Sequence, residues 1–256
     1  MMWWQQYKKE LMGNRTELLF LLGFFLVWTL FLLSRAGVWE PAVVIALYGA
    51  PPSGILPLWA LWASVQLYRQ EWRENTSYLM LSLPVRARVI TSAKLAALLT
   101  GVLGFALLFA VGGWLLLART GLWGEVFQRH VFSLIPWEYA VKMSLLTGGA
   151  VLAALVIVAL VAQFAYVFSR LFSRLQGLVM VWTWVLSFWL MARVVDVGGR
   201  LLAFMPDFHL RLLTIHNQVP EFEMVTVESG PLWALALFVA GLYTLLNAVL
   251  ERAVEV

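Results

Sequence analysis

The sequence has no cysteine and few charged residues. Of 256 residues, 12% are charged and 62% belong to the hydrophobic and aromatic types, whereas ordinary soluble domains are about 25% charged. The lack of cysteine excludes a disulfide framework, a thiolate metal site and a cysteine nucleophile. The lack of charge excludes a soluble enzyme, a disordered chain and a soluble nucleic-acid-binding protein. The composition predicts an all-α integral membrane protein that forms a single transmembrane domain, 1–256.

Six apolar stretches are long enough to cross a bilayer, which takes about 20 mostly apolar residues as a helix. The second stretch contains Pro51, Pro52 and Gly54, so we expect either a kinked helix or a separate outer piece. The predicted spans are 18–34, 42–67, 95–117, 143–168, 178–195 and 231–250.

Charge asymmetry predicts the orientation of the chain. Six spans place both termini on one side, and eleven of the 18 basic residues fall on that side. Basic residues are enriched in cytoplasmic loops. We therefore expect a multi-pass protein of a bacterial cell membrane with both termini in the cytoplasm.

Residues 1–16 are rich in aromatic and basic side chains. Their spacing predicts a helix that lies in the headgroup region, with indoles buried and ammonium groups near anionic lipid. A simple topology anchor is the alternative interpretation, and the two are compatible. The residues expected to contact the interface are Trp3, Trp4, Tyr7, Lys8 and Lys9.

The segment 68–94, between the second and third spans, is too long for a tight turn. It contains a short apolar run that Pro84 ends, followed by Arg86 and Arg88. An apolar patch rimmed by charge favours a docking surface for another protein. A helix that lies on the membrane is the alternative.

This segment and the lead helix together resemble the ABC-2-type transporter permeases. In that family Glu, then Gly or Asn, then Thr precedes a short helix that ends Leu-Pro-Val, with a basic residue and a later Lys. The matching residues here are Glu74, Asn75, Thr76, Leu83, Pro84, Val85, Arg86 and Lys94. The resemblance implies a lead helix called the elbow helix, and a cytoplasmic coupling helix that inserts into a separate ATPase subunit. The expected coupling residues are Glu71, Glu74, Asn75, Thr76, Leu81, Leu83, Pro84, Val85 and Arg86.

The outer loop, 196–230, is too apolar for a free aqueous loop. We expect a re-entrant or interfacial element there, between the fifth and sixth spans, as the resemblance also implies; an amphipathic helix on the outer leaflet is the alternative. Near this loop Arg193 and Asp196 can pair on one helix face. His209 and His216 lie seven residues apart, but two histidines without a third ligand give little support for a metal site, so none is predicted.

The sequence lacks a phosphate-binding G-x-x-x-x-G-K-[ST] loop, and the predicted spans hold almost no acidic residues. Neither catalysis nor a cofactor is therefore expected on this chain. Polar or aromatic residues within the spans that either line a pathway or pack between helices are Gln66, Gln163, Trp182 and Asn247.

The resemblance implies a permease subunit of an ATP-binding-cassette transporter that moves an amphiphilic or hydrophobic substrate, in the export direction. ATP and Mg²⁺ would bind two ABC ATPase subunits, identical or a heteropair, and a second permease copy or homologue would complete the pathway. Membrane lipids are the remaining expected partner, and nucleic acid is not one. The alternative is a membrane anchor or sensor subunit that docks a cytoplasmic signalling partner without transport.

Overall fold

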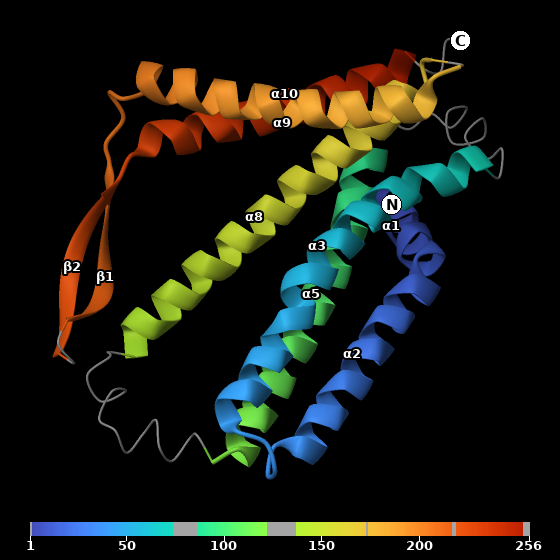
Figure 1. Cartoon of the computed structure of the whole chain (residues 1–256). Coiled ribbons are helices and arrows are strands. Elements are labelled where there is room, and N and C mark those ends of the chain that lie inside the picture. Colours follow the sequence, from blue (N-terminus) through green and yellow to red (C-terminus); the bar gives the residue numbers. More distant parts are fainter. Residues whose placement is uncertain (1, 74–85, 122–136, 173, 217–218, 253–256) are drawn as a thin grey trace. The chain divides into compact units, whose positions relative to one another are not determined.

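The computed structural model describes the whole chain except residues 1, 74–85, 122–136, 173, 217–218 and 253–256. The described part forms seven helices and one β-hairpin (Figure 1). The elements in order are α1 (Met2–Gly13), α2 (Arg15–Arg35), α3 (Pro41–Arg73), α5 (Ala87–Arg119), α8 (Trp137–Ser169), α9 (Gln176–Leu201), β1 (Phe208–His216), β2 (Val219–Val227) and α10 (Ser229–Arg252).

Six of these helices are long and apolar enough to cross a membrane, with lengths from 21 to 33 residues. This confirms the six predicted spans and is what a multi-pass membrane protein requires. The helices extend beyond the apolar runs: α5 begins at Ala87 rather than near 95, and α3 continues to Arg73 rather than ending near 67. A hydropathy pattern marks only the lipid-facing part of a helix, because helical backbone is equally satisfied in water.

Helix α3 is continuous through Pro51 and Pro52, so the interpretation of its outer part as a separate piece is wrong. A proline has no N–H, so Pro51 leaves the carbonyl of Leu47 without its usual helical donor. The indole N–H of Trp28 in α2 donates to that carbonyl at 3.3 Å. A side chain from the neighbouring helix thus satisfies a backbone group that a membrane span cannot leave unpaired at low cost.

The chain divides into two compact units, Met1–Ala159 and Leu160–Val256, which we describe separately. The first contains α1, α2, α3 and α5, and an aromatic cluster forms the centre of its core. Phe25 of α2 lies 4.7 Å from Phe105 of α5 and 5.4 Å from Tyr48 of α3, measured between ring centroids. The Tyr48 hydroxyl donates to the carbonyl of Phe109 at 2.6 Å. These contacts join three spans at one level.

In the second unit, α9 and α10 lie side by side (Figure 1), and glycines allow their close approach. A Cβ on Gly230 would lie 2.5 Å from the carbonyl oxygen of Gly199, and one on Gly198 would lie 2.8 Å from the Cβ of Ala234. Small residues at a helix crossing are the usual means by which membrane helices pack closely.

The loop between α9 and α10 forms an antiparallel hairpin, with Phe208 opposite Val227 and His216 opposite Val219. The all-α expectation is therefore wrong for this segment, and the expected re-entrant or interfacial element is a pair of strands. Side chains alternate between the two faces of a strand, so Phe208, Leu210 and Leu212 share one face while His209 and Arg211 share the other. This period of two in the sequence is the signal for strands, whereas apolar content alone favours a membrane element.

Gly230→Ala is expected to destabilise the second unit, because the new methyl group must displace the backbone of α9. Overpacking of this kind costs about 1–3 kcal/mol. Gly241→Ala in the same helix is the control: a Cβ there meets nothing within 4 Å, and alanine favours a helix over glycine by up to about 1 kcal/mol. Thermal unfolding in detergent should therefore give a lower midpoint for Gly230→Ala and an equal or higher one for Gly241→Ala.

Trp28→Phe is expected to leave the Leu47 carbonyl without a donor, which costs about 1–3 kcal/mol for a buried group. Pro51→Ala supplies a backbone N–H for that carbonyl, so Trp28→Phe should cost much less in a Pro51→Ala background. A double-mutant cycle on thermal unfolding measures this coupling. Strictly additive effects would show that the indole does not replace the missing N–H.

Candidate functional site

The structure describes only part of the predicted coupling segment. Glu71 lies in the last turn of α3, and Arg86 is the exposed residue directly before α5. The other predicted coupling residues lie outside the described residues: Glu74, Asn75, Thr76, Leu81, Leu83, Pro84 and Val85.

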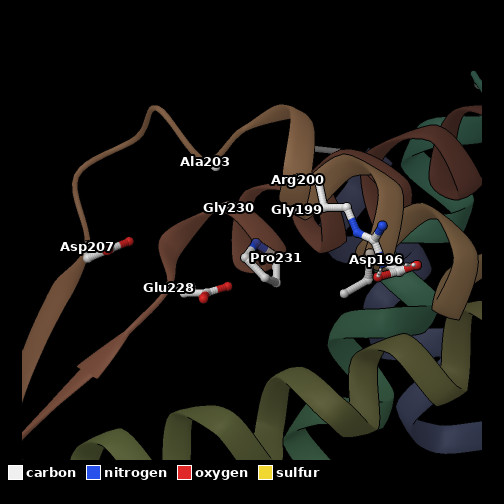
Figure 2. Close-up of a pocket in the computed structure, with 9 residues that line it drawn as sticks. Asp196, Gly199, Arg200, Ala203, Asp207, Glu228, Gly230 and Pro231 are labelled. Atoms are coloured by element: carbon white, nitrogen blue, oxygen red, sulfur yellow. Dashed lines mark hydrogen bonds and ion pairs between the residues drawn. The ribbon is translucent and has the colours of Figure 1, made fainter.

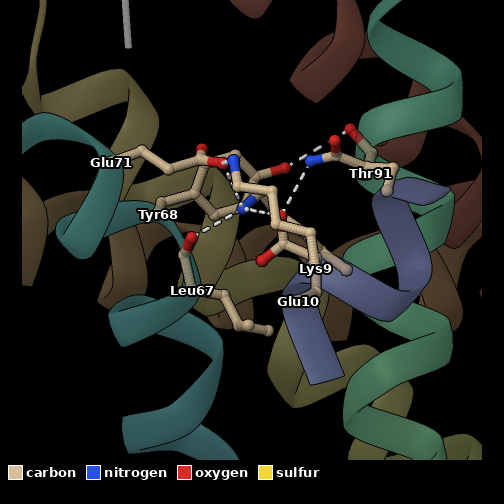
Figure 3. Close-up of polar contacts among 8 residues, drawn as sticks. Lys9, Glu10, Leu67, Tyr68, Glu71 and Thr91 are labelled. Atoms are coloured by element: carbon tan, nitrogen blue, oxygen red, sulfur yellow. Dashed lines mark hydrogen bonds and ion pairs between the residues drawn. The ribbon is translucent and has the colours of Figure 1, made fainter. Parts of the chain in front are cut away.

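A buried polar network lies at the end of the first unit that carries α1 (Figure 3). Its centre is Lys94 of α5, whose side chain is fully buried. The Lys94 ammonium lies 3.0 Å from Glu10 Oε1 of α1 and 3.2 Å from Glu71 Oε1 of α3, and it donates to the Leu67 carbonyl at 2.6 Å. One lysine thus contacts α1 and α3 from its position on α5.

Helical spacing places each member of the network. Gln6 and Glu10 are four residues apart on α1, so the Gln6 amide can donate to Glu10 Oε1, at 2.8 Å. Tyr68 is three residues before Glu71, and the centroid of its ring lies 4.9 Å from the Lys94 ammonium. The hydroxyls of Tyr68 and Thr91 lie 3.3 Å apart, which adds a further polar contact between α3 and α5.

The network is close to electrically balanced. A lysine ammonium has three N–H donors, and three oxygen atoms lie within 3.2 Å of Lys94 Nζ, two as hydrogen-bond acceptors and one as an ion-pair partner. Two of these are carboxylates, and the second cation is Lys9, which lies 3.1 Å from Glu71 Oε1 and is 56% exposed. A buried charge is tolerated only when it is paired and hydrogen-bonded, so the three helix ends must stay together while Lys94 is charged.

Burial and the neighbouring charges act on the pKa of Glu10 in opposite directions. Burial raises the pKa of the Glu10 carboxyl above its ordinary value of 4.5, and the nearby Glu71 carboxylate adds to this, while Lys94 and Lys9 act against it. Desolvation is the largest of these effects. The net direction is upward.

The predicted interfacial residues lie on a helix, α1, and two of the aromatic ones form hydrogen bonds with α5. The indole N–H of Trp3 donates to the Ser92 hydroxyl at 3.0 Å, and the hydroxyls of Tyr7 and Thr100 lie 2.8 Å apart. The rings of Trp3 and Tyr7 stack with centroids 5.5 Å apart. Trp3 and Tyr7 therefore fasten α1 to α5, in addition to any contact with lipid.

The remaining predicted interfacial residues behave differently from one another. Trp4 is 54% exposed, and the Lys8 ammonium lies 5.5 Å from its ring centroid. An exposed indole beside a lysine is typical of a membrane interface. Lys9 instead points to the buried network, through its ion pair with Glu71.

Sequence reasoning missed Glu10 entirely and named Lys94 only as part of a motif. The available signal is a charge next to an apolar run: Lys94 directly precedes the 95–117 span. An ionisable residue at such a place needs a partner. Glu10, three residues after Tyr7 on a helix rich in aromatic residues, is a suitable acid.

The polar residues predicted within the spans have varied surroundings. Asn247 is buried and donates to the Tyr243 carbonyl of its own helix at 2.7 Å. Gln163 is fully buried, and its amide has no hydrogen-bond partner among the described residues. Gln66 is half-buried, and Trp182 is 58% exposed. These four positions form no common site in the units as described.

A cavity of about 550 Å³ lies where the hairpin joins α9 and α10 (Figure 2). Asp196 at its edge pairs with Arg200 at 3.0 Å; the expected pair with Arg193 is wrong, and the Arg193 guanidinium lies over the Trp189 ring instead. Asp207 accepts from the backbone N–H of Ser229 at 3.3 Å. The bond between Asp207 and Ser229 links the two ends of the hairpin. Within the described residues, no group of three or more His, Asp or Glu is arranged to hold a metal ion.

Comparison with protein-family models, curated proteins and solved structures finds no significant match for this chain.

The raised pKa of Glu10 predicts a pH dependence of stability. The folded protein takes up a proton on Glu10 at higher pH than the unfolded chain, so the stability that Glu10 contributes is greatest below pH 4.5 and falls as the pH rises through the folded-state pKa. The unfolding midpoint of the wild type should therefore rise relative to that of Glu10→Gln as the pH falls from 8 toward 5. Glu40→Gln, which removes an exposed carboxylate outside the network, is the control. A difference that shrinks as the pH falls would contradict the upward shift.

Proposed function

We propose that this chain is the permease subunit of an ATP-driven transporter of the ABC-2 type, which exports an amphiphilic or hydrophobic substrate while a separate subunit hydrolyses ATP. The observation that carries the proposal is the Lys94 network. It links α1 to α3 and α5, the two helices that flank the segment 74–85 in the sequence, and that segment resembles the coupling helix of ABC-2 permeases.

The position of the network suits a mechanical input. Glu71 is two residues before the end of α3 at Arg73, and Lys94 lies eight residues after Arg86. Both helices that flank the segment are 33 residues long and continuous. A displacement of the segment would therefore tilt two whole spans as rigid bodies, which is a common form of switching transition.

The surface near the segment suits a protein partner. Arg73 and Arg86, at its two ends, are both exposed, and a charged rim steers association with an oppositely charged partner. ATP and Mg²⁺ would be bound by that partner, because this sequence has no phosphate-binding loop of the P-loop type. Two ATPase subunits and a second permease, identical or homologous, complete the proposed transporter.

The proposal sets an orientation. The end of the first unit that carries α1 and the network faces the cytoplasm of a bacterial cell, as do both termini, and the hairpin lies outside. Trp4 and Lys8 of α1 contact the headgroups of the inner leaflet. The excess of basic residues on the side of the termini supports this orientation.

Arg86→Glu and Leu83→Asp are expected to abolish binding of the ATPase without unfolding the spans. The tagged protein is extracted from its native membrane in mild detergent, and the proteins that accompany it are identified by mass and assayed for ATP hydrolysis. Arg119→Glu is the matched control, because Arg119 is an exposed basic residue at the opposite end of α5. The wild type and the control should retain a stoichiometric ATPase that the two variants lose.

Two results would overturn the proposal. A wild-type chain that purifies alone and without ATP hydrolysis would show that no ATPase subunit binds it. A stoichiometric partner that does not hydrolyse ATP would instead favour a membrane anchor or sensor subunit.

A further inference from the structure

Ion pairs link helix α1 to both helices that flank the segment 74–85 in the sequence. Glu71 precedes the segment and Lys94 follows it, and Glu10 of α1 accepts from Lys94 at 3.0 Å. Lys9, also on α1, pairs with Glu71 at 3.1 Å. Helix α1 therefore contacts the helix on each side of the segment through an ion pair.

We propose that Lys94 is a positioning residue that fixes α1 to the ends of α3 and α5, so that α1 moves together with these two helix ends as one body. This inference rests on the proposed function, because the motion is the one that a bound ATPase would impose. Its consequence is that the lead helix carries the motion to the membrane interface, where Trp4 lies exposed, rather than staying fixed while the spans move past it.

Three features favour a single body. The Lys94 ammonium donates to Glu10 of α1 and to the Leu67 carbonyl of α3, and it forms an ion pair with Glu71 of α3. A shift of any one of the three helices would therefore weaken the pairing of a buried charge. The cost of a lone buried charge is far larger than that of an exposed one. Two further bonds, from Trp3 to Ser92 and between Tyr7 and Thr100, hold α1 to α5 along its length.

The first test measures whether Lys94 holds α1 in place, independently of transport. The chain has no cysteine, so Trp3→Cys with Ser92→Cys gives a single reactive pair. A short bis-methanethiosulfonate linker is used, because the bridging tryptophan leaves a gap longer than a disulfide spans. Fast, near-complete cross-linking is expected with Lys94 intact and should be lost with Lys94→Met.

Lys94→Met leaves two buried carboxylates and can prevent folding. A second variant, Lys94→Met with Glu10→Gln and Glu71→Gln, removes all three charges and is therefore expected to fold. It should also lose fast cross-linking. Retention of fast cross-linking in this neutral variant would show that packing alone places α1, and would overturn the role of Lys94.

The second test measures motion in the complex with the ATPase. An environment-sensitive dye is placed on Met12→Cys, a 71% exposed position on α1, and its emission is followed on addition of ATP, Mg²⁺ and vanadate. The emission should shift in the wild-type background and not in the neutral variant. A dye on Arg69→Cys, an exposed position near the end of α3, should shift in both.

Rescue distinguishes positioning from general stability. Linking positions 3 and 92 in the neutral variant should restore the nucleotide-dependent motion of α1, which is then followed by a dye at a second α1 position, Lys8. A dye on α1 that shifts in the unlinked neutral variant, or a link that blocks the shift in the wild type, would overturn the inference. Absence of any ATPase would overturn the proposed function instead, and the cross-linking result would still stand.

Discussion

The burial of one lysine charge determines how the first unit is arranged at the end that carries α1. A fully buried ammonium needs hydrogen-bond acceptors and a compensating negative charge, and two other helices provide both for Lys94. The positions of α1 and of the end of α3 are therefore set relative to α5. Most of the predicted coupling residues fall within or beside the segment that these helix ends flank.

The same constraint, that polar groups in an apolar environment must find partners within the protein, acts on the backbone of the spans. Pro51 frees the carbonyl of Leu47, and α3 continues as a helix because Trp28 of α2 donates to that carbonyl. At the α9–α10 crossing, Gly199 and Gly230 let two backbones approach closely without a side chain between them. At Pro51 a side chain of the neighbouring helix replaces a missing backbone donor, and at the glycine crossing two backbones are in direct contact. In both places the packing of one helix depends on the other.

Some of this arrangement was predictable from the sequence. Length and apolar content predicted six spans because those two properties decide whether a helix can cross a bilayer. They did not predict that α5 begins at Ala87, because the added turns are polar on one side. The hairpin was not predicted, because only the apolar content of the loop was considered. The alternation of apolar and polar residues from Phe208 to Leu212, which indicates a strand, was not. The Lys94 network was missed because its members lie up to 84 residues apart in the chain, and no local pattern pairs Glu10 with Lys94.

The chemistry of the network also bears on the choice between a moving subunit and a static anchor. A buried ion pair is weak evidence of stability, since well-packed apolar residues often stabilise a protein as much or more. What a buried pair does provide is a strong penalty against alternative arrangements of the groups that it joins. A static anchor needs only an exposed surface, whereas helices that are pushed by a partner must keep their register under load. The presence of two carboxylates and a lysine at the junction of α1, α3 and α5 therefore favours a junction that transmits motion.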